Sequence, residues 1–316
     1  MGNDYCLSRK SKIQDQQFFK SEIAYHLERL KDIPIRQQNV FEYENKSIID
    51  LLKNIDINVQ DQINKGQEDR SLENNDSIKV DFAQYTQIGN EIMIQLQQKI
   101  MDLDSNKQDW SILIDDIESS HFLKIQIAQT QMDDGNYINT IISQFIVPCY
   151  PQKFIDYMGN FNEQKKLDDR IDQFKCISKN VEDKEQIIYL SYKKVSILSA
   201  RDFIYFKKTK LIDEDQQVWC DASKSIQNDK ICPIKNTIIR GTIYISGYII
   251  QPLKNILKFN SYSQRFASLK LKSENYSFVQ MCSECDYKLK IPFYFAKRQV
   301  KEEMINYINK LQNNLQ

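Results

Sequence analysis

The chain has 316 residues, of which 41% are hydrophobic and 11% aromatic, and its 43 basic residues balance its 43 acidic residues. A chain of this length can bury one substantial core together with an accessory region. The formal net charge of zero lacks the basic excess that is typical of nucleic-acid-binding proteins, so we expect no nucleic-acid partner.

Residues for catalysis and for phosphate binding are scarce. There are two histidines, His26 and His121, too few for most catalytic triads or histidine-rich metal sites. The seven glycines form neither of the glycine-rich motifs that bind nucleotide phosphates. The seven scattered cysteines indicate reduced thiols, as in the cytoplasm. We therefore predict a non-enzymatic protein with no catalytic residue, no metal and no cofactor.

The first twelve residues, MGNDYCLSRKSK, carry a pattern for acylation. Removal of Met1 would expose Gly2 for N-myristoylation, although the usual pattern has Ser or Thr where Cys6 stands. One myristoyl chain binds membranes only marginally, so stable anchoring needs a second signal, such as palmitate on Cys6 or the nearby basic residues. The plainer alternative is a chain that begins Met-Gly without acylation. We predict lipidation at Gly2 and Cys6 and a peripheral location on the cytosolic face of a membrane.

No apolar run approaches the ~20 residues that span a bilayer, and no secretory signal pattern opens the chain. Ile13 to Ile33 and Ser47 to Ile57 have the apolar spacing of helices. Gln60 to Ser77 is charged and poor in apolar residues, which is typical of a linker. The predicted organisation is an anchor over 1–12, a helical accessory region over 13–59, a polar linker over 60–77 and a main domain over 78–316.

The main domain begins with a helix. From Phe82 to Leu103 the apolar residues recur in steps of three and four, which predicts an amphipathic helix. After Trp110 the period changes to two, and the stretches FLKIQIAQ and INTIISQFIV indicate strands. Pro151 then has the position of a first helical residue, followed by apolar residues at helical spacing.

A series of strands and a closing helix follow. Short connections between consecutive strands favour an antiparallel sheet, and a long antiparallel sheet curls. The apolar stripe of the last helix, which includes Met304 and Ile308, must lie on something apolar. We therefore predict an α+β fold in which a curved sheet wraps round the C-terminal helix and encloses an apolar tunnel. The expected strands are 187–197, 202–212, QQVWCDASKSI, 238–250, RFASLKLKSE and 276–291.

Several of these stretches resemble one family. They are Trp110 after the first helix, VPCYPQKFIDYMGNFNEQKKLDD, SARDFIYF, IRGTIYISGYIIQPL and the helix after Pro292. Together, from about Phe82 to Leu315, they resemble a START domain, the steroidogenic-acute-regulatory-protein-related lipid-transfer fold. The chain departs from the family pattern at Leu167–Asp168, where Trp-Asp is common, and lacks a glycine in YKLKIPF.

The resemblance implies binding and transfer of one lipid in an apolar cavity, without covalent chemistry. Some sterol-binding relatives have an acidic residue at the position that falls at Ile188, so the resemblance favours a phospholipid or a similar lipid over a sterol. The alternative is a membrane-tethered lipid sensor that binds lipid without transferring it. In either case we expect a monomer whose partners are a lipid ligand and, through the acylated N-terminus, a membrane surface.

The stretch SARDFIYFKK, residues 199–208, contains the candidate ligand contacts. Neighbouring residues of a strand face opposite sides, so we expect Arg201 and Asp202 to have separate partners. Family members often have a basic residue near the ligand's polar end at the position of Lys207, which otherwise lies at a solvated strand end. If Lys207 is buried, a carboxylate or phosphate must be nearby. The predicted lipid-binding residues are Arg201, Phe203, Tyr205, Lys207, Met304 and Ile308.

Two further stretches, Cys282–Cys285 and Lys208–Gln216, carry weaker expectations. Cys282 and Cys285 form a lone C-x-x-C pair, but residues three apart on a strand face opposite ways, which opposes a shared metal. We also expect the stretch from Lys208 to Gln216 to form a loop that opens with the last helix to admit the ligand.

Overall fold

The computed structural model describes residues 80–101, 109–116, 122–132, 137–194, 199–258, 266, 275–288 and 293–316. The chain divides into two compact units, Met1–Asn75 and Asp76–Gln316, and all described residues belong to the second. The predicted lipidation sites Gly2 and Cys6, the two N-terminal helices and the polar linker lie outside the described residues. No described helix is long and apolar enough to cross a membrane.

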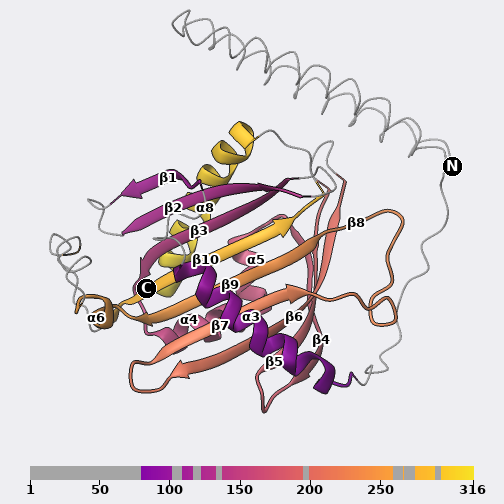
Figure 1. Ribbon diagram of the computed structural model, residues 1–316, viewed down its shortest axis with the longest axis horizontal. Helices are drawn as coiled ribbons and strands as arrows, with labels where there is room; N and C mark the ends of the chain where they lie inside the picture. The colour runs from indigo at the N-terminus through magenta and orange to yellow at the C-terminus, as the bar shows by residue number, and fades with distance from the viewer. Residues whose placement is uncertain are drawn as a thin grey trace, which may run out of the picture. The chain divides into compact units, whose positions relative to one another are not determined.

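Ten strands form a single sheet (Figure 1). The order is β1-β2-β3-β10-β9-β7-β6-β5-β4, all antiparallel, and the short β8 pairs in parallel with β6. Neighbours in sequence are mostly neighbours in the sheet, as expected for hairpin connections. The strands are β1 (Ser111–Asp116), β2 (Leu123–Gln131), β3 (Tyr137–Val147), β4 (Ile171–Asn180), β5 (Glu185–Tyr192), β6 (Arg201–Asp213), β7 (Val218–Ser225), β8 (Ile239–Arg240), β9 (Thr242–Pro252) and β10 (Ser277–Asp286).

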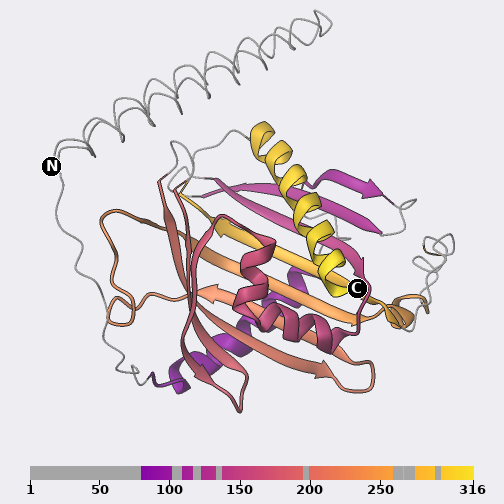
Figure 2. The ribbon, with the colours of Figure 1, turned by 180° about the vertical axis from the view of Figure 1, so that it is seen from behind.

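Helices cover both faces of the sheet. α3 (Ala83–Met101) crosses one face, which we call the α3 face. α8 (Phe293–Leu315), α4 (Pro151–Gly159) and α5 (Phe161–Leu167) lie on the opposite, concave face, which we call the α8 face (Figure 2). The short α6 (Leu253–Ile256) follows β9. The curved antiparallel sheet with its long C-terminal helix confirms the predicted α+β helix-grip fold.

α3 packs closely on the sheet at Gly247 of β9, which has no Cβ atom. The buried residues of this helix, among them Ile92, Leu96 and Ile100, follow the predicted spacing of three and four. They pack against strand residues such as Phe206 and Cys282. A Cβ atom at Gly247 of β9 would overlap the carbonyl oxygen of Asp221 and lie 2.9 Å from Leu96.

The C-terminal half of α8 is fixed to the sheet more firmly than the N-terminal half. Ile308, Leu311 and Leu315 are fully buried in the cluster that also contains α4. The side-chain amide of Gln312 is buried and donates a hydrogen bond of 2.7 Å to the carbonyl of Ile146. The N-terminal half, from Phe293 to about Glu303, has mostly half-buried or exposed side chains instead.

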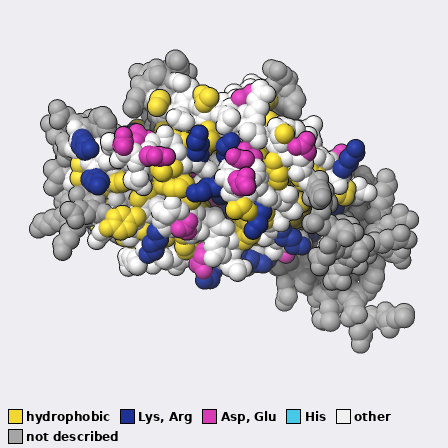
Figure 3. Space-filling model, turned by 90° about the horizontal axis from the view of Figure 1, so that it is seen from below, with side chains coloured by type: hydrophobic (Ala, Val, Ile, Leu, Met, Phe, Trp, Pro, Cys, Tyr) yellow, Lys and Arg dark blue, Asp and Glu magenta, His cyan; other side chains and the backbone are white. Residues whose placement is uncertain are grey.

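The described surface mixes charges of both signs. Figure 3 shows one face, on which Lys and Arg side chains alternate with Asp and Glu and with apolar groups. The described part of this face therefore carries no extended patch of one sign.

Most elements lie where the sequence predicts them, with two differences and one prediction left open. β4 and α5 were not predicted, because β4 has few buried side chains and an edge position. The prediction of a loop from Lys208 to Gln216 is wrong, because residues up to Asp213 belong to β6 and a tight turn follows. Of the strand expected at RFASLKLKSE, only Phe266 is described, so that prediction remains open.

Candidate functional site

A cavity of about 320 Å³ lies between the N-terminal half of α8 and the concave face of the sheet. Side chains of β2, β3, β5, β6, β10 and α8 line it. They include apolar groups such as Ile141 and Val300, and polar groups such as Asn139 and Arg201. This volume is at the lower end of the ~300–1,000 Å³ that is typical of pockets for drug-sized ligands.

Arg201 is the buried cation of this cavity. It is the first residue of β6, and only 8% of its surface is exposed. Its Nε donates to the carbonyl oxygen of Tyr287 at 2.9 Å, and Nη1 donates to the carbonyl oxygen of Ser199. No carboxylate of the described residues pairs with it, and burial lowers the pKa of its guanidinium.

The neighbouring Asp202 has a different partner on the other face of the sheet. Arg240 donates to both of its carboxylate oxygens, at 2.6 and 3.0 Å. Ile204 and Phe206 share that face and pack under α3. The prediction that Arg201 and Asp202 have separate partners is therefore confirmed, and the strand alternation on which it depended holds along β6.

Phe203 and Tyr205 lie behind the cavity lining rather than in it. Both are buried in a cluster with Ile188. The ring of Phe203 meets the ring of Tyr287 edge-on, with centroids 5.4 Å apart, and Tyr287 also lines the cavity. Burial raises the pKa of Tyr205 well above its ordinary value, so its hydroxyl is a neutral hydrogen-bonding group.

Lys207 is neither solvated nor unpaired. Its Nζ lies 2.8 Å from Oδ2 of Asp221 on the adjacent strand β7. Asp221 also accepts a hydrogen bond of 3.0 Å from the hydroxyl of Thr209. The predicted need for a nearby acidic group is thus met by Asp221, which the sequence analysis missed because it requires the register between β6 and β7.

The two predicted residues of α8 lie farther from the cavity. Ile308 is fully buried among the residues that anchor the C-terminal half of the helix, and Met304 packs against the same cluster. Close to them the hydroxyl groups of Tyr248 and Tyr307 lie 3.1 Å apart. Of the predicted residues, Arg201 therefore lines the cavity, and Phe203 and Tyr205 lie in the buried cluster behind it. Met304 and Ile308 lie toward the helix anchor. Whether these residues contact a lipid stays a prediction.

An ion-pair cluster that the sequence analysis missed joins α8 to the rest of the site. Arg170, between α5 and β4, lines the cavity and contacts Asp168 through Nε and Nη2, each at 2.8 Å. Its Nη1 donates to Glu303 of α8 at 2.7 Å. Although burial acts in the opposite direction, the hydrogen bonds and charge of Arg170 lower the pKa of Asp168. No local pattern could reveal this cluster, since Arg170 and Glu303 are 133 residues apart.

No group of three or more His, Cys, Asp or Glu side chains in the described residues is placed to hold a metal ion. Cys282 packs on the α3 face, whereas Cys285 lines the cavity on the α8 face. This confirms the predicted opposite orientation of the C-x-x-C pair. Both histidines lie outside the described residues.

Comparisons with known proteins agree with this architecture. The sequence model of the START domain family matches residues 95–316. No curated protein matches the sequence. The fold is similar to that of human StAR-related lipid transfer protein 5, with a TM-score of 0.57 and 14% identity over 74% of this chain and 98% of that one. It is also similar to human STARD10, with a TM-score of 0.52 and 12% identity over 76% of this chain and 82% of that one. The chain therefore belongs to the START domain family, a family of lipid-binding and lipid-transfer proteins.

Proposed function

We propose that this protein binds one lipid in the cavity under α8, without covalent chemistry, and transfers it between membranes. The observation that carries the proposal is Arg201, a nearly buried cation that lines the cavity without a carboxylate partner among the described residues. A buried charge is costly unless it is paired and hydrogen-bonded. A lipid with a phosphate or another strongly polar head group would complete the pairing.

The guanidinium of Arg201 favours a phospholipid, or a similar lipid, over a sterol. The absence of an acidic residue at Ile188 no longer bears on the choice, because Asp221 supplies a carboxylate beside Lys207 from another strand. The preference depends instead on Arg201, whose guanidinium can hold a phosphate through two hydrogen bonds.

Lipid binding requires the N-terminal half of α8 to move. A diacyl lipid has ~30 methylenes, and burial of each contributes ~0.8 kcal/mol to binding. The volume of such a lipid is larger than the cavity of about 320 Å³. The weakly buried start of α8 is the part of the helix best able to move outward, while its anchored end keeps the helix attached.

Native mass spectrometry of the purified protein, with extraction of bound lipid, tests the proposal directly. We expect one lipid per chain, and acceleration of phospholipid exchange between donor and acceptor vesicles. Arg201→Gln should weaken binding of an anionic phospholipid about tenfold or more, whereas Arg201→Lys should retain part of it. Arg298→Gln is the control, because this exposed arginine pairs with Glu302 within α8.

A protein that binds phospholipid in these assays but does not accelerate exchange would be a sensor, the alternative function. Absence of bound lipid from the unchanged chain as well as from the Arg201 variants would contradict both functions.

We also propose that the protein acts at the cytosolic face of a membrane, held there by acyl chains on Gly2 and Cys6. The motif MGNDYC and the basic residues after it support this anchor. Fractionation of cells that express Gly2→Ala, Cys6→Ser or the unchanged chain tests it. We expect each substitution to move protein from the membrane pellet to the supernatant, and equal pelleting of all three would exclude acyl anchoring.

A further inference from the structure

A second cavity, of about 370 Å³, lies on the other flank of α8, between this helix and the edge strand β1. We call it the β1–α8 groove and define it by Leu113, Ile114, Leu123, Lys301, Ile305 and Ile308. None of the residues that line the groove lines the cavity with Arg201. The groove is therefore a separate hollow of the described structure.

A β-bulge gives the groove much of its apolar wall. Ile112 pairs with Gln126 and Ile114 pairs with Ile125, so Leu113 is an extra residue on β1. A bulge of this kind lets two successive side chains turn to one side of a strand. Both Leu113 and Ile114 line the groove, and both remain only half-buried.

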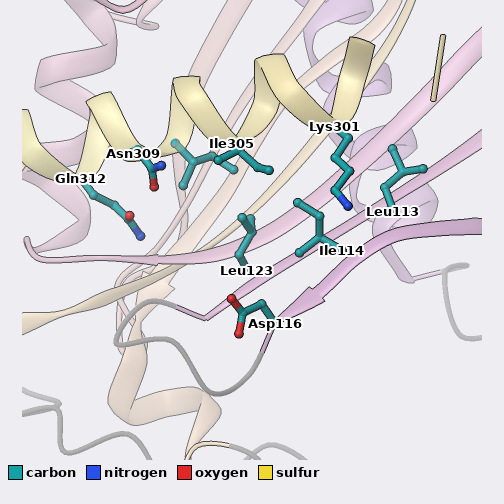
Figure 4. Close-up of a pocket in the computed structure, with 9 residues that line it drawn as sticks. Leu113, Ile114, Asp116, Leu123, Lys301, Ile305, Asn309 and Gln312 are labelled. Carbon is teal, nitrogen blue, oxygen red and sulfur yellow. The ribbon is translucent and has the colours of Figure 1, made fainter. Parts of the chain in front are cut away.

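Lys301 supplies an isolated positive charge at this apolar wall. It has no ion pair or hydrogen bond with any other described residue, whereas Glu302 and Glu303 beside it are paired with Arg298 and Arg170. In Figure 4 its side chain extends from α8 toward Ile114. An amphipathic anion would match this combination of one cation and an aliphatic wall.

The other polar side chains of the groove belong to Asp116, Asn309 and Gln312. Asp116 lies below Leu123, on the side away from α8, and already has an interaction partner (Figure 4). Gln312 uses its amide to bind the carbonyl of Ile146. Lys301 and Gln312 are eleven residues apart along α8, which corresponds to about 16 Å of helix. The groove therefore has Lys301 at one end, aliphatic side chains between, and the polar side chains of Asn309 and Gln312 toward the other end (Figure 4).

We propose that the β1–α8 groove binds the anion of a single-chain fatty acid. The carboxylate pairs with Lys301, and the chain lies along Leu113, Ile114, Leu123 and Ile305. A single lysine suits a carboxylate of charge −1, whereas a phosphate of charge ≈ −1.5 to −2 is usually held by several donors. The volume of about 370 Å³ is on the scale of one acyl chain rather than two. This site is distinct from the lipid cavity and does not depend on the function proposed for it.

Oleate is the probe, with the full chain, native mass spectrometry for stoichiometry and displacement of a fluorescent fatty acid for affinity. Leu113→Trp fills the groove and should abolish oleate binding. Ile112→Trp is its matched control, because this neighbouring side chain is exposed and does not line the groove. Lys301→Gln should weaken binding about three- to fivefold, and Lys301→Glu should weaken it further, while Lys297→Gln, one turn earlier, should leave it unchanged.

Ile141→Trp, which fills the main cavity, separates the two sites. Oleate binding that survives Ile141→Trp and is lost with Leu113→Trp supports the groove. Oleate binding that is lost with Ile141→Trp and survives Leu113→Trp overturns the groove, and leaves the lipid cavity standing. Absence of oleate binding to the unchanged chain, or equal binding by the Lys301→Glu variant, also overturns it. Thermal unfolding of each variant shows whether it is folded, and the exposed Lys301 variants keep the test decisive if Leu113→Trp does not fold.

Discussion

The Nζ atom of Lys207 lies 2.8 Å from Oδ2 of Asp221, with 12% and 4% of the two side chains exposed. In the register of β6 and β7, Lys207 is opposite Ser223 and Thr209 is opposite Asp221, so the ion pair is a diagonal contact between adjacent strands. Thr209 completes the site with a second hydrogen bond to the same oxygen. An opposite charge therefore compensates the lysine on the concave face in the absence of ligand.

Removal of one member of this pair should be far more harmful than removal of both. Lys207→Met leaves the Asp221 carboxylate buried without its cation, and we expect the free energy of unfolding to fall by about 3 kcal/mol or more. The double variant Lys207→Met/Asp221→Leu should recover part of that loss. Urea unfolding measures both, with Lys210→Met, at an exposed position of the same strand, as the control. Additive effects of the two substitutions would show that the pair is not coupled.

The contact between Arg170 and Glu303 should control how readily α8 opens. This pair is 43% and 41% exposed, so it contributes little to global stability, but it connects the weakly buried N-terminal half of the helix to Arg170, which lines the cavity. We expect Glu303→Gln to change the free energy of unfolding by less than about 1 kcal/mol and to accelerate lipid release in a vesicle exchange assay. Glu302→Gln breaks only a pair within α8 and should leave release unchanged. Equal release rates in both variants would rule out control of α8 opening by the contact between Arg170 and Glu303.

Asp168 makes part of the stability dependent on pH. The pKa of its carboxyl is below the ordinary value of 3.8, because Arg170 outweighs the effect of burial. A depressed pKa in the folded state stabilises the fold above pH ~4, and this contribution is lost as the pH falls through the lowered value. We expect Asp168→Asn to be less stable than the unchanged chain at pH 7, and the difference to shrink toward pH 3. Urea unfolding at both pH values measures it, and a constant difference would contradict the assignment.

Local periodicity accounts for most of what the sequence predicts correctly. Arg201, Phe203 and Tyr205 lie on one face of β6 because successive side chains of a strand point to opposite faces of the sheet. The apolar residues of α3 and α8 likewise recur every three or four positions, because one face of each helix packs on the sheet. These patterns depend only on near neighbours in the chain.

The features that the sequence could not predict depend on register or on distant contacts. Asp221 meets Lys207 only in one alignment of β6 and β7, and a shift of one residue would turn it to the other face. Glu303 contacts Arg170, which lies 133 residues earlier in the sequence. The bulge at Leu113 is a single extra residue that no turn or glycine signal marks.

The packing of α3 on the sheet should be sensitive to one methyl group. A Cβ atom at Gly247 overlaps the backbone of Asp221 and crowds Leu96, and neither neighbour can move freely because both are buried. We expect Gly247→Ala to lower the free energy of unfolding by about 1–3 kcal/mol. Gly159→Ala is the control, since a Cβ atom there meets nothing within 4 Å and alanine favours the helix. Comparable melting temperatures for the two variants would refute the close approach of α3.

The thiol of Cys285 reports on the environment of the lipid cavity. It lines the cavity, and burial raises its pKa to about 11. Compared with a free cysteine of pKa ~8.5, its thiolate fraction at pH 8 is lower by about two orders of magnitude. We therefore expect iodoacetamide to label Cys285 at least about a hundredfold more slowly in the folded protein than in urea, as measured by mass spectrometry of the peptide that contains it. Cys176, whose pKa burial also raises but which does not line the cavity, serves as the internal comparison. Rapid labelling of Cys285 at pH 8 would contradict the shielding of its thiol from solvent beside the cavity.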